Sequence, residues 1–178
     1  MAEPTKPETV GLLIGLLSVY DAAFDQAELK LEQLYGAVEL RGGPFDFDFT
    51  DYYERDMGSP IKRRFLLMRE LISPCALADI KLATNAIERE LAESGAYPVA
   101  RPVNIDPGYI AESKLVLASA KDYSHRIYLR DGIYAEVTLI YRDGAFHAQP
   151  WTYLDFQSDG YIRFLIDARA ALRRLRKT

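Results

Sequence analysis

Side chains that could bind a ligand or transfer a proton concentrate between Lys121 and Tyr153, in the segment KDYSHRIYLRDGIYAEVTLIYRDGAFHAQPWTY. Its alternating pattern and turn residues predict three β-strands, joined by a three-residue loop at Arg130–Gly132 and a two-residue loop at Asp143-Gly144. The resulting register places the polar side chains of this meander on one face: Arg126, Glu136, Thr138, His147 and Gln149. This face is the first candidate for a ligand site.

Asp106, Glu136 and His125 are the candidates for acid–base catalysis, because carboxylates and imidazoles can accept and return a proton. In the predicted register His125 lies on the apolar face opposite Val137, where a histidine is commonly a hydrogen-bonded core residue. Arg126 lies opposite Glu136, so this pair could hold an anionic substrate or could form only a cross-strand ion pair. Both interpretations stay open.

The candidate substrate-binding residues are Lys114, Lys121, Arg126, Tyr109 and Thr138. A strand over Val99–Ile105 is expected to end at the turn sequence Asp106-Pro107-Gly108 and to lead into a short helix over Tyr109–Ala120. Ligands of α/β folds favour the carboxyl ends of strands, and helix N-termini favour anions. The lysines would then lie near an anionic group. In the simpler alternative, Asp106 only caps the helix.

A candidate metal site lies in the stretch PFDFDFTDYY at residues 44–53. Phe45, Phe47 and Phe49 alternate with Asp46 and Asp48, which predicts a strand with an aromatic face inward and an acidic face outward. Two carboxylates at positions i and i+2 could share a divalent cation such as Mg²⁺ through their oxygens. The alternative is a solvated strand face whose charges discourage edge pairing.

The composition bounds the class of protein. A chain of 178 residues can form one domain that buries roughly 70% of its unfolded surface. The net charge of −4 and the pI near 5.3 argue against a general nucleic-acid binder, although Lys62-Arg63-Arg64 form a basic cluster. The apolar run Val10–Tyr20 is too short to span a bilayer. The single cysteine, Cys75, allows no intrachain disulfide, so a cytoplasmic location is expected.

The candidate residues need a scaffold of strands and helices. Val10–Leu17 has the pattern of a strand buried on both faces, and a helix is expected to follow it. Ser73-Pro74 and Ser158 have the pattern of helix starts. Residues 1–9 are expected to form a loose tail and residues 10–176 a single globular domain. The expected fold is α+β or α/β, with a mixed sheet of about six strands, a C-terminal antiparallel meander and about four helices.

Four stretches resemble the bacterial and archaeal family called Domain of Unknown Function 4416: PFDFDFTDYYERDMG, NIDPGYIAESKLVLASAKDYSHRIYL, GIYAEVTLIYRDG and PWTYLDF. The resemblance extends from about Thr9 to Arg173, and Asp56 departs from the glutamate expected before Met57-Gly58. It implies no reaction and no catalytic residues. Some members are described as GTP-binding proteins. Here the first strand is followed by GLLSVYD in place of a GxxxxGK[ST] phosphate loop, and no Asn-Lys-x-Asp element is present.

Two functions from different classes follow from these patterns. The first is a small-molecule binding protein or enzyme for an anionic compound, such as a phosphorylated metabolite, with its site beside the meander. The second is a non-catalytic module that docks a protein partner through its polar sheet face and its aromatic strand. Nucleic-acid binding through Lys62–Arg64 is a weaker third reading, because the net charge is negative.

Overall fold

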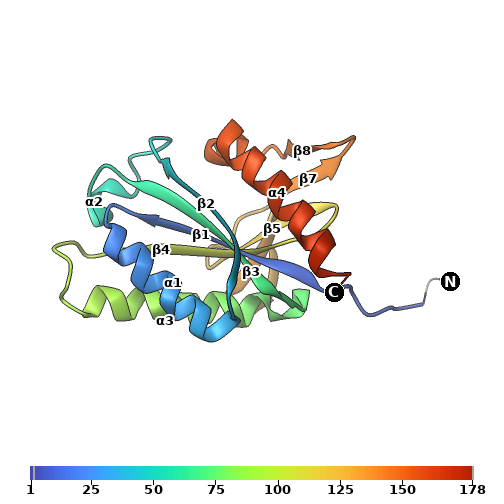
Figure 1. Cartoon of the computed structure of the whole chain (residues 1–178), viewed down its shortest axis with the longest axis horizontal. Helices are drawn as coiled ribbons and strands as arrows, with labels where there is room; N and C mark the ends of the chain where they lie inside the picture. Colours follow the sequence, from blue (N-terminus) through green and yellow to red (C-terminus); the bar gives the residue numbers. More distant parts are fainter. Residues whose placement is uncertain (2, 178) are drawn as a thin grey trace.

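A computed structural model describes residue 1 and residues 3–177. In this part of the chain, one eight-stranded sheet is packed by four α-helices (Figure 1). The elements follow in the order β1 (Val10–Ser18), α1 (Asp21–Tyr35), β2 (Val38–Asp46), α2 (Glu54–Met57), β3 (Lys62–Ile72), η1 (Pro74–Ala76), α3 (Leu77–Glu93), β4 (Asn104–Ile110), β5 (Lys114–Ser119), β6 (Ile127–Arg130), β7 (Ile133–Arg142), β8 (Ala145–Ala148), η2 (Leu154–Gln157) and α4 (Asp159–Leu175).

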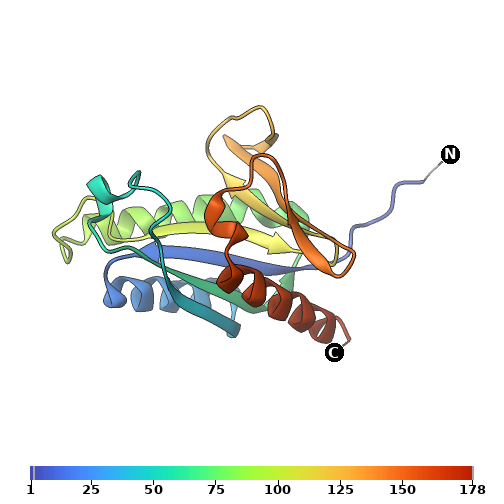
Figure 2. The same ribbon diagram turned by 90° about the horizontal axis from the view of Figure 1, so that it is seen from above.

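The strands lie in the order β2-β3-β1-β4-β5-β7-β6, and β8 pairs with the free part of β7. Every described pairing is antiparallel. Helices α1 and α3 cover one face of the sheet, and α4 covers part of the other (Figures 1 and 2). The α+β class and the number of helices are confirmed. The prediction of a mixed sheet with about six strands was wrong, because the sheet is antiparallel and has eight.

Strand β1 lies at the centre of the sheet and is apolar along its whole length because both of its faces are covered. Leu12, Ile14 and Leu16 pack against α1 and α3. Leu13 points to the opposite face, into the cluster under α4. The prediction of a strand buried on both faces is therefore confirmed.

Three segments differ from the sequence prediction. The helix expected over Tyr109–Ala120 is absent, because the chain continues as β4 and turns into β5. The Asp106-Pro107-Gly108 sequence lies inside β4, where Pro107 pairs with Ile14 and pairing with β5 begins only at Gly108. The strand expected at residues 44–53 ends at Asp46, which pairs with Lys62 at the start of β3, and one further hydrogen bond joins the Phe47 amide to the Ile61 carbonyl.

The helix starts at Ser73-Pro74 and Ser158 are confirmed by η1 with α3 and by α4. The hydroxyl of Ser73 accepts a hydrogen bond from the Cys75 amide, as expected of a capping residue. No helix in the described part of the chain is long and apolar enough to cross a membrane.

The meander register is largely as predicted. Tyr128 pairs with Tyr134, and Tyr141 pairs with Phe146 across the two-residue turn. The first turn differs from the predicted three-residue loop, because Arg130 pairs with Ile133. A register shift between Tyr128 and Arg130 leaves out Leu129. Asp131 and Gly132 both adopt positive φ, which suits a two-residue hairpin turn.

Candidate functional site

A buried carboxylate, Glu136 on β7, organises the polar side chains beside the meander. Its Oε2 accepts hydrogen bonds from Arg126 Nε at 2.7 Å and from His125 Nε2 at 3.1 Å. Its Oε1 accepts one from the hydroxyl of Thr138 at 3.3 Å. The side chains of Glu136 and Arg126 are only 3% and 4% exposed. We call Glu136, Arg126, His125 and Thr138 the Glu136 network.

The guanidinium of Arg126 contacts several groups inside the protein through Nε and Nη1. Besides Glu136, it donates to the hydroxyl of Ser119 at 2.7 Å and to the carbonyl of Lys121 at 3.0 Å, and it lies over the ring of Tyr123. A buried arginine with this many partners fixes the geometry of its neighbours. Arg126 therefore joins the end of β5 to β7 and positions Glu136.

His125 is placed differently from the prediction that it faces the apolar side near Val137. Strand β6 begins only at Ile127, and a turn closed by the bond from the Arg126 amide to the Tyr123 carbonyl precedes it. Because strand alternation does not apply in this turn, the neighbouring side chains of His125 and Arg126 both reach Glu136.

The imidazole of His125 is held between two aromatic rings and remains partly open. The Trp151 ring lies parallel to it, with 5.2 Å between centroids and 9° between planes, and Tyr123 stacks at 6.0 Å. The side chain is 19% exposed. Its Nδ1 makes no hydrogen bond within the described residues and is not among their buried unpartnered polar atoms, so this nitrogen reaches the surface.

The segment between β8 and α4 carries Trp151 and is tied back to β7. The Trp151 Nε1 donates to the carbonyl of Val137 at 2.9 Å, and the Thr152 hydroxyl donates to the carbonyl of Thr138. A register shift in the β5–β7 pairing at this point leaves Thr138 as an extra residue. Bulges free backbone groups from the ladder, which is how these two carbonyls become available to the loop.

A second network, centred on Arg63, lies on the same face of the sheet. Arg63 on β3 is 4% exposed and donates to Asp106 on β4 and to Asp155 in η2, both at 3.2 Å. Its guanidinium crosses β1 above Gly15, where an added Cβ would lie 2.7 Å from Nη1. Glycine at this position therefore lets a side chain from β3 reach a carboxylate on β4.

The Arg63 network perturbs the titration of its members. Burial raises the pKa of Asp155, and Arg63 offsets only part of that effect. Burial alone would also raise the pKa of Asp106, but the nearby cations, Arg63 first among them, lower it below its ordinary value. Burial raises the pKa of Tyr53 and of Tyr161 to about 12. Both phenols therefore stay protonated at neutral pH.

The Arg63 network also reaches the helical face through β4. Asn104 donates to Asp106 at 2.7 Å and accepts a hydrogen bond from Arg101, which in turn donates to Glu88 on α3. Arg63 Nε completes no hydrogen bond within the described residues. This continuous chain of charged and amide groups locks β3, β4, α3 and the loop before α4 together.

The two networks are separate within the described residues. No hydrogen bond or ion pair there joins Asp106 to Arg126 or to Glu136. Lys121, whose carbonyl accepts from Arg126, extends from the Glu136 network over the surface: its ammonium donates to the Tyr52 hydroxyl at 3.2 Å and lies 4.7 Å from the centre of that ring. Of the predicted site residues, the structure thus gathers His125, Arg126, Glu136, Thr138 and Lys121 around one surface and places Asp106 in the other network.

The remaining candidates lie elsewhere. Lys114 begins β5, at the opposite end of that strand from Lys121. Tyr109 packs with Leu77 and its neighbours on the face covered by α3, where burial raises the pKa of its hydroxyl. Asp46 and Asp48 are exposed. Among the described residues, no three histidine, cysteine or acidic side chains come close enough to hold a metal ion.

Several residues of the two networks were missed from the sequence: Arg63, Asp155, Ser119, Tyr123 and Trp151. In the sequence Arg63 belongs to the basic cluster considered for nucleic-acid binding, but Arg63 is buried and Arg64 pairs with Asp25 and Glu28. A usable signal was the period of two from Arg63 through Phe65 to Leu67, which places the arginine on an inward face. Trp151 and Asp155 lie within the quoted stretch PWTYLDF, where no pattern marked them as functional.

Comparison with known proteins defines the family. The family model described as domain of unknown function, DUF4416, matches residues 8–171 of the 178. The chain therefore belongs to this family, and the resemblance found in the sequence is confirmed. No curated protein and no solved structure matches the chain.

Proposed function

We propose that the surface around His125 binds a small anionic molecule and that His125 exchanges a proton with it. One observation carries the proposal: a partly exposed imidazole is hydrogen-bonded through Nε2 to a buried carboxylate and has Nδ1 directed to the surface. A carboxylate that orients an imidazole in this way is the usual support for a histidine acting as a general acid or base.

The neighbouring residues fit complementary roles in this proposal. Arg126 balances the charge of Glu136, so the carboxylate stays fixed while the imidazole gains or loses a proton. Lys121 supplies an exposed ammonium for the anionic group of the ligand, such as a phosphate. Trp151 and Tyr123 offer flat apolar surfaces on either side of the imidazole.

The experiment is a thermal-shift screen of anionic metabolites, phosphorylated compounds and divalent cations, because a ligand that binds only the folded state raises the unfolding midpoint. Binding of each hit is then measured for His125→Ala and for His147→Ala. His147 is the matched control, since it is the only other histidine in the sequence and its Nε2 is hydrogen-bonded to the Arg142 carbonyl. Loss of binding in His125→Ala alone supports the proposal. Equal affinity in both variants contradicts it.

The same screen tests the proposed cation site. A hit with Mg²⁺ that disappears in Asp46→Asn and Asp48→Asn would assign the metal to these exposed carboxylates. A thermal shift with Mg²⁺ that persists in both variants would show that Asp46 and Asp48 do not bind the metal.

Docking of a protein partner is the second candidate function, and one observation favours it. Large hydrophobic side chains around the His125 surface are exposed: Tyr52, Tyr123, Trp151, Tyr153 and Leu154. Exposed aromatic residues are typical of interaction sites. Substituting Leu154 by Ser separates the two functions, because it would weaken a protein contact and leave binding of a small molecule at His125 unchanged.

A further inference from the structure

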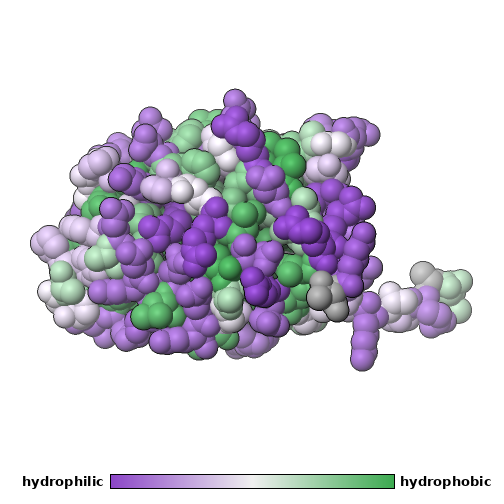
Figure 3. Space-filling model, viewed as in Figure 1, coloured by the Kyte–Doolittle hydropathy of each residue, from purple (hydrophilic) through white to green (hydrophobic). Residues whose placement is uncertain are grey.

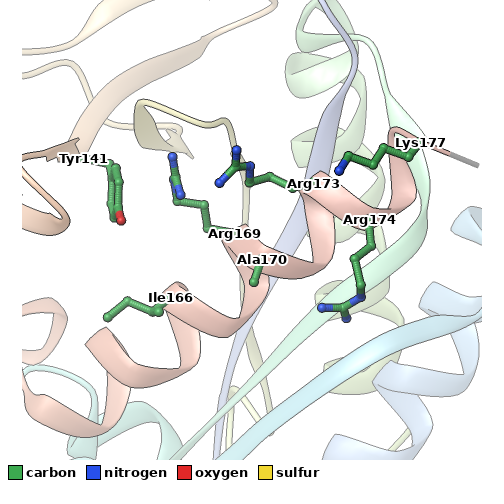
Figure 4. Close-up of a pocket in the computed structure, with 7 residues that line it drawn as sticks. All are labelled: Tyr141, Ile166, Arg169, Ala170, Arg173, Arg174 and Lys177. Carbon is green, nitrogen blue, oxygen red and sulfur yellow. The ribbon is translucent and has the colours of Figure 1, made fainter.

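A hollow of about 480 Å³ with a basic lining lies beside the C-terminal helix α4 (Figure 4). Hydrophilic side chains gather over this part of the molecule (Figure 3). Seven residues line the hollow, and four of them are cationic while none is acidic: Tyr141, Ile166, Arg169, Ala170, Arg173, Arg174 and Lys177. It lies apart from His125 and contains none of the residues of the two networks.

The basic residues follow the helical period. Arg169 and Arg173 are spaced at i and i+4, which brings them to one side of α4, and Lys177 follows just beyond the end of the helix at Leu175. Like charges at this spacing repel each other and destabilise a helix by a few tenths of a kcal/mol per pair. Arg169 and Arg173 extend next to each other, with the Tyr141 ring facing Arg169 (Figure 4). The negative end of the helix dipole offsets part of this repulsion, and negative charge from outside the helix would offset more of it.

The protein supplies only part of that charge. Glu112, in the turn between β4 and β5, lies near three guanidinium groups, those of Arg169, Arg173 and Arg176. The distances are 3.7, 3.6 and 3.6 Å, which are ion pairs without hydrogen bonds. Arg169 instead donates to the Glu112 backbone carbonyl at 2.7 Å. Within the described residues Arg173, 58% exposed, makes no hydrogen bond, so its N–H groups can serve another acceptor.

We propose that this hollow binds a small phosphorylated molecule. A guanidinium whose donors are unused among the described residues matches the oxygens of a phosphate, and Lys177, which lines the hollow just beyond α4, adds a point charge. Ile166, Ala170 and Tyr141 give the hollow an apolar part that suits the carbon skeleton of the ligand. Its volume is that of an ordinary metabolite site. A nucleic-acid strand is the less favoured phosphate source, because the whole chain carries a net charge of −4.

The test measures calorimetric binding of pyrophosphate and of inorganic phosphate to the full chain, at constant ionic strength set with chloride. Arg173→Gln removes the proposed anchor. Arg163→Gln is the matched control, because Arg163 is an exposed arginine of the same helix outside the hollow. Circular dichroism and the unfolding midpoint confirm that both variants fold.

We expect saturable binding of pyrophosphate that Arg173→Gln weakens by about tenfold or more and Arg163→Gln changes by less than about twofold. Non-saturable binding, or equal affinity in the two variants, would overturn the proposal. A DNA oligonucleotide that binds more tightly than pyrophosphate, with a steep dependence on salt, would also overturn it. Because this inference does not rest on the function proposed for His125, the variant His125→Ala should bind pyrophosphate normally.

Discussion

Replacing Glu136 by Gln keeps the shape of the side chain and removes its charge. This substitution should destabilise the fold strongly. Arg126 would then be a buried cation, 4% exposed, without its counter-ion. Removing one partner of a buried ion pair costs about 3–5 kcal/mol. The amide oxygen of the glutamine can still accept from one donor, so a loss near 3 kcal/mol is expected. For a chain of this length, that corresponds to a fall of roughly 6–12 °C in the unfolding midpoint.

The assay is urea denaturation of Glu136→Gln, Arg126→Met and the double variant. If the two charges stabilise mainly each other, the double variant should be no less stable than Glu136→Gln, which gives a large coupling energy. Glu93→Gln is the control, because Glu93 is an exposed carboxylate at the end of α3 and should change stability by less than about 0.5 kcal/mol. A cost below about 1 kcal/mol for Glu136→Gln, or additive single substitutions, would refute the reasoning.

Three further predictions concern the Arg63 network. Arg63→Met should lower the free energy of unfolding by about 3–5 kcal/mol in urea, because Asp106 and Asp155 lose their shared cation; a cost below about 1 kcal/mol would contradict this role. Gly15→Ala should cost about 1–3 kcal/mol by displacing the guanidinium that passes 2.7 Å from the new Cβ, and a neutral result would show that Arg63 has another path to Asp106. The third prediction concerns pH. The lowered pKa of Asp106 stabilises the fold above pH 3.8, the ordinary pKa of an aspartate, and this contribution is lost as the pH falls through the lower pKa of the folded state. The raised pKa of Asp155 is unfavourable above its folded value, and this effect vanishes as the pH falls toward 3.8. When the pH is lowered from 7 to 4, the natural protein should therefore become more stable relative to the Asp155→Asn variant. The stability of the natural protein relative to Asp106→Asn should stay constant from pH 7 to pH 4 and decrease at lower pH. Parallel curves would show that the two carboxylates are not perturbed in opposite directions.

The meander could be predicted in detail because its register depends on local chemistry. The Asp143-Gly144 turn and the alternation on either side of it allow one pairing, and Tyr141 opposite Phe146 is found as expected. The same local reasoning failed for β4 and β5. Pro107 and Gly108 have the pattern of a turn, but the edge of β1 continues the sheet through both residues. Tertiary pairing therefore outweighed a strong local preference.

The candidate site was predictable only where it depends on strand alternation. Glu136 lies on the polar face of β7, as the alternation predicts, and its expected ion pair with Arg126 forms at 2.7 Å, although Arg126 reaches it from the turn before β6. The side on which His125 lies depends instead on where β6 begins and on stacking against Trp151, which arrives from another part of the chain. Arg63 joins residues 43 and 92 positions away along the chain, a separation that no window of sequence covers.

The central claim is that Glu136 holds the imidazole of His125 with Nδ1 open to a ligand. Nitrogen-15 NMR of the two imidazoles tests it most directly, before and after addition of a hit from the metabolite screen. The neutral ring of His125 should carry its proton on Nε2, and the ligand should shift the Nδ1 resonance of His125 while that of His147 stays unchanged. A proton on Nδ1 in the free protein, or a bound ligand that leaves His125 unaffected, would contradict the claim.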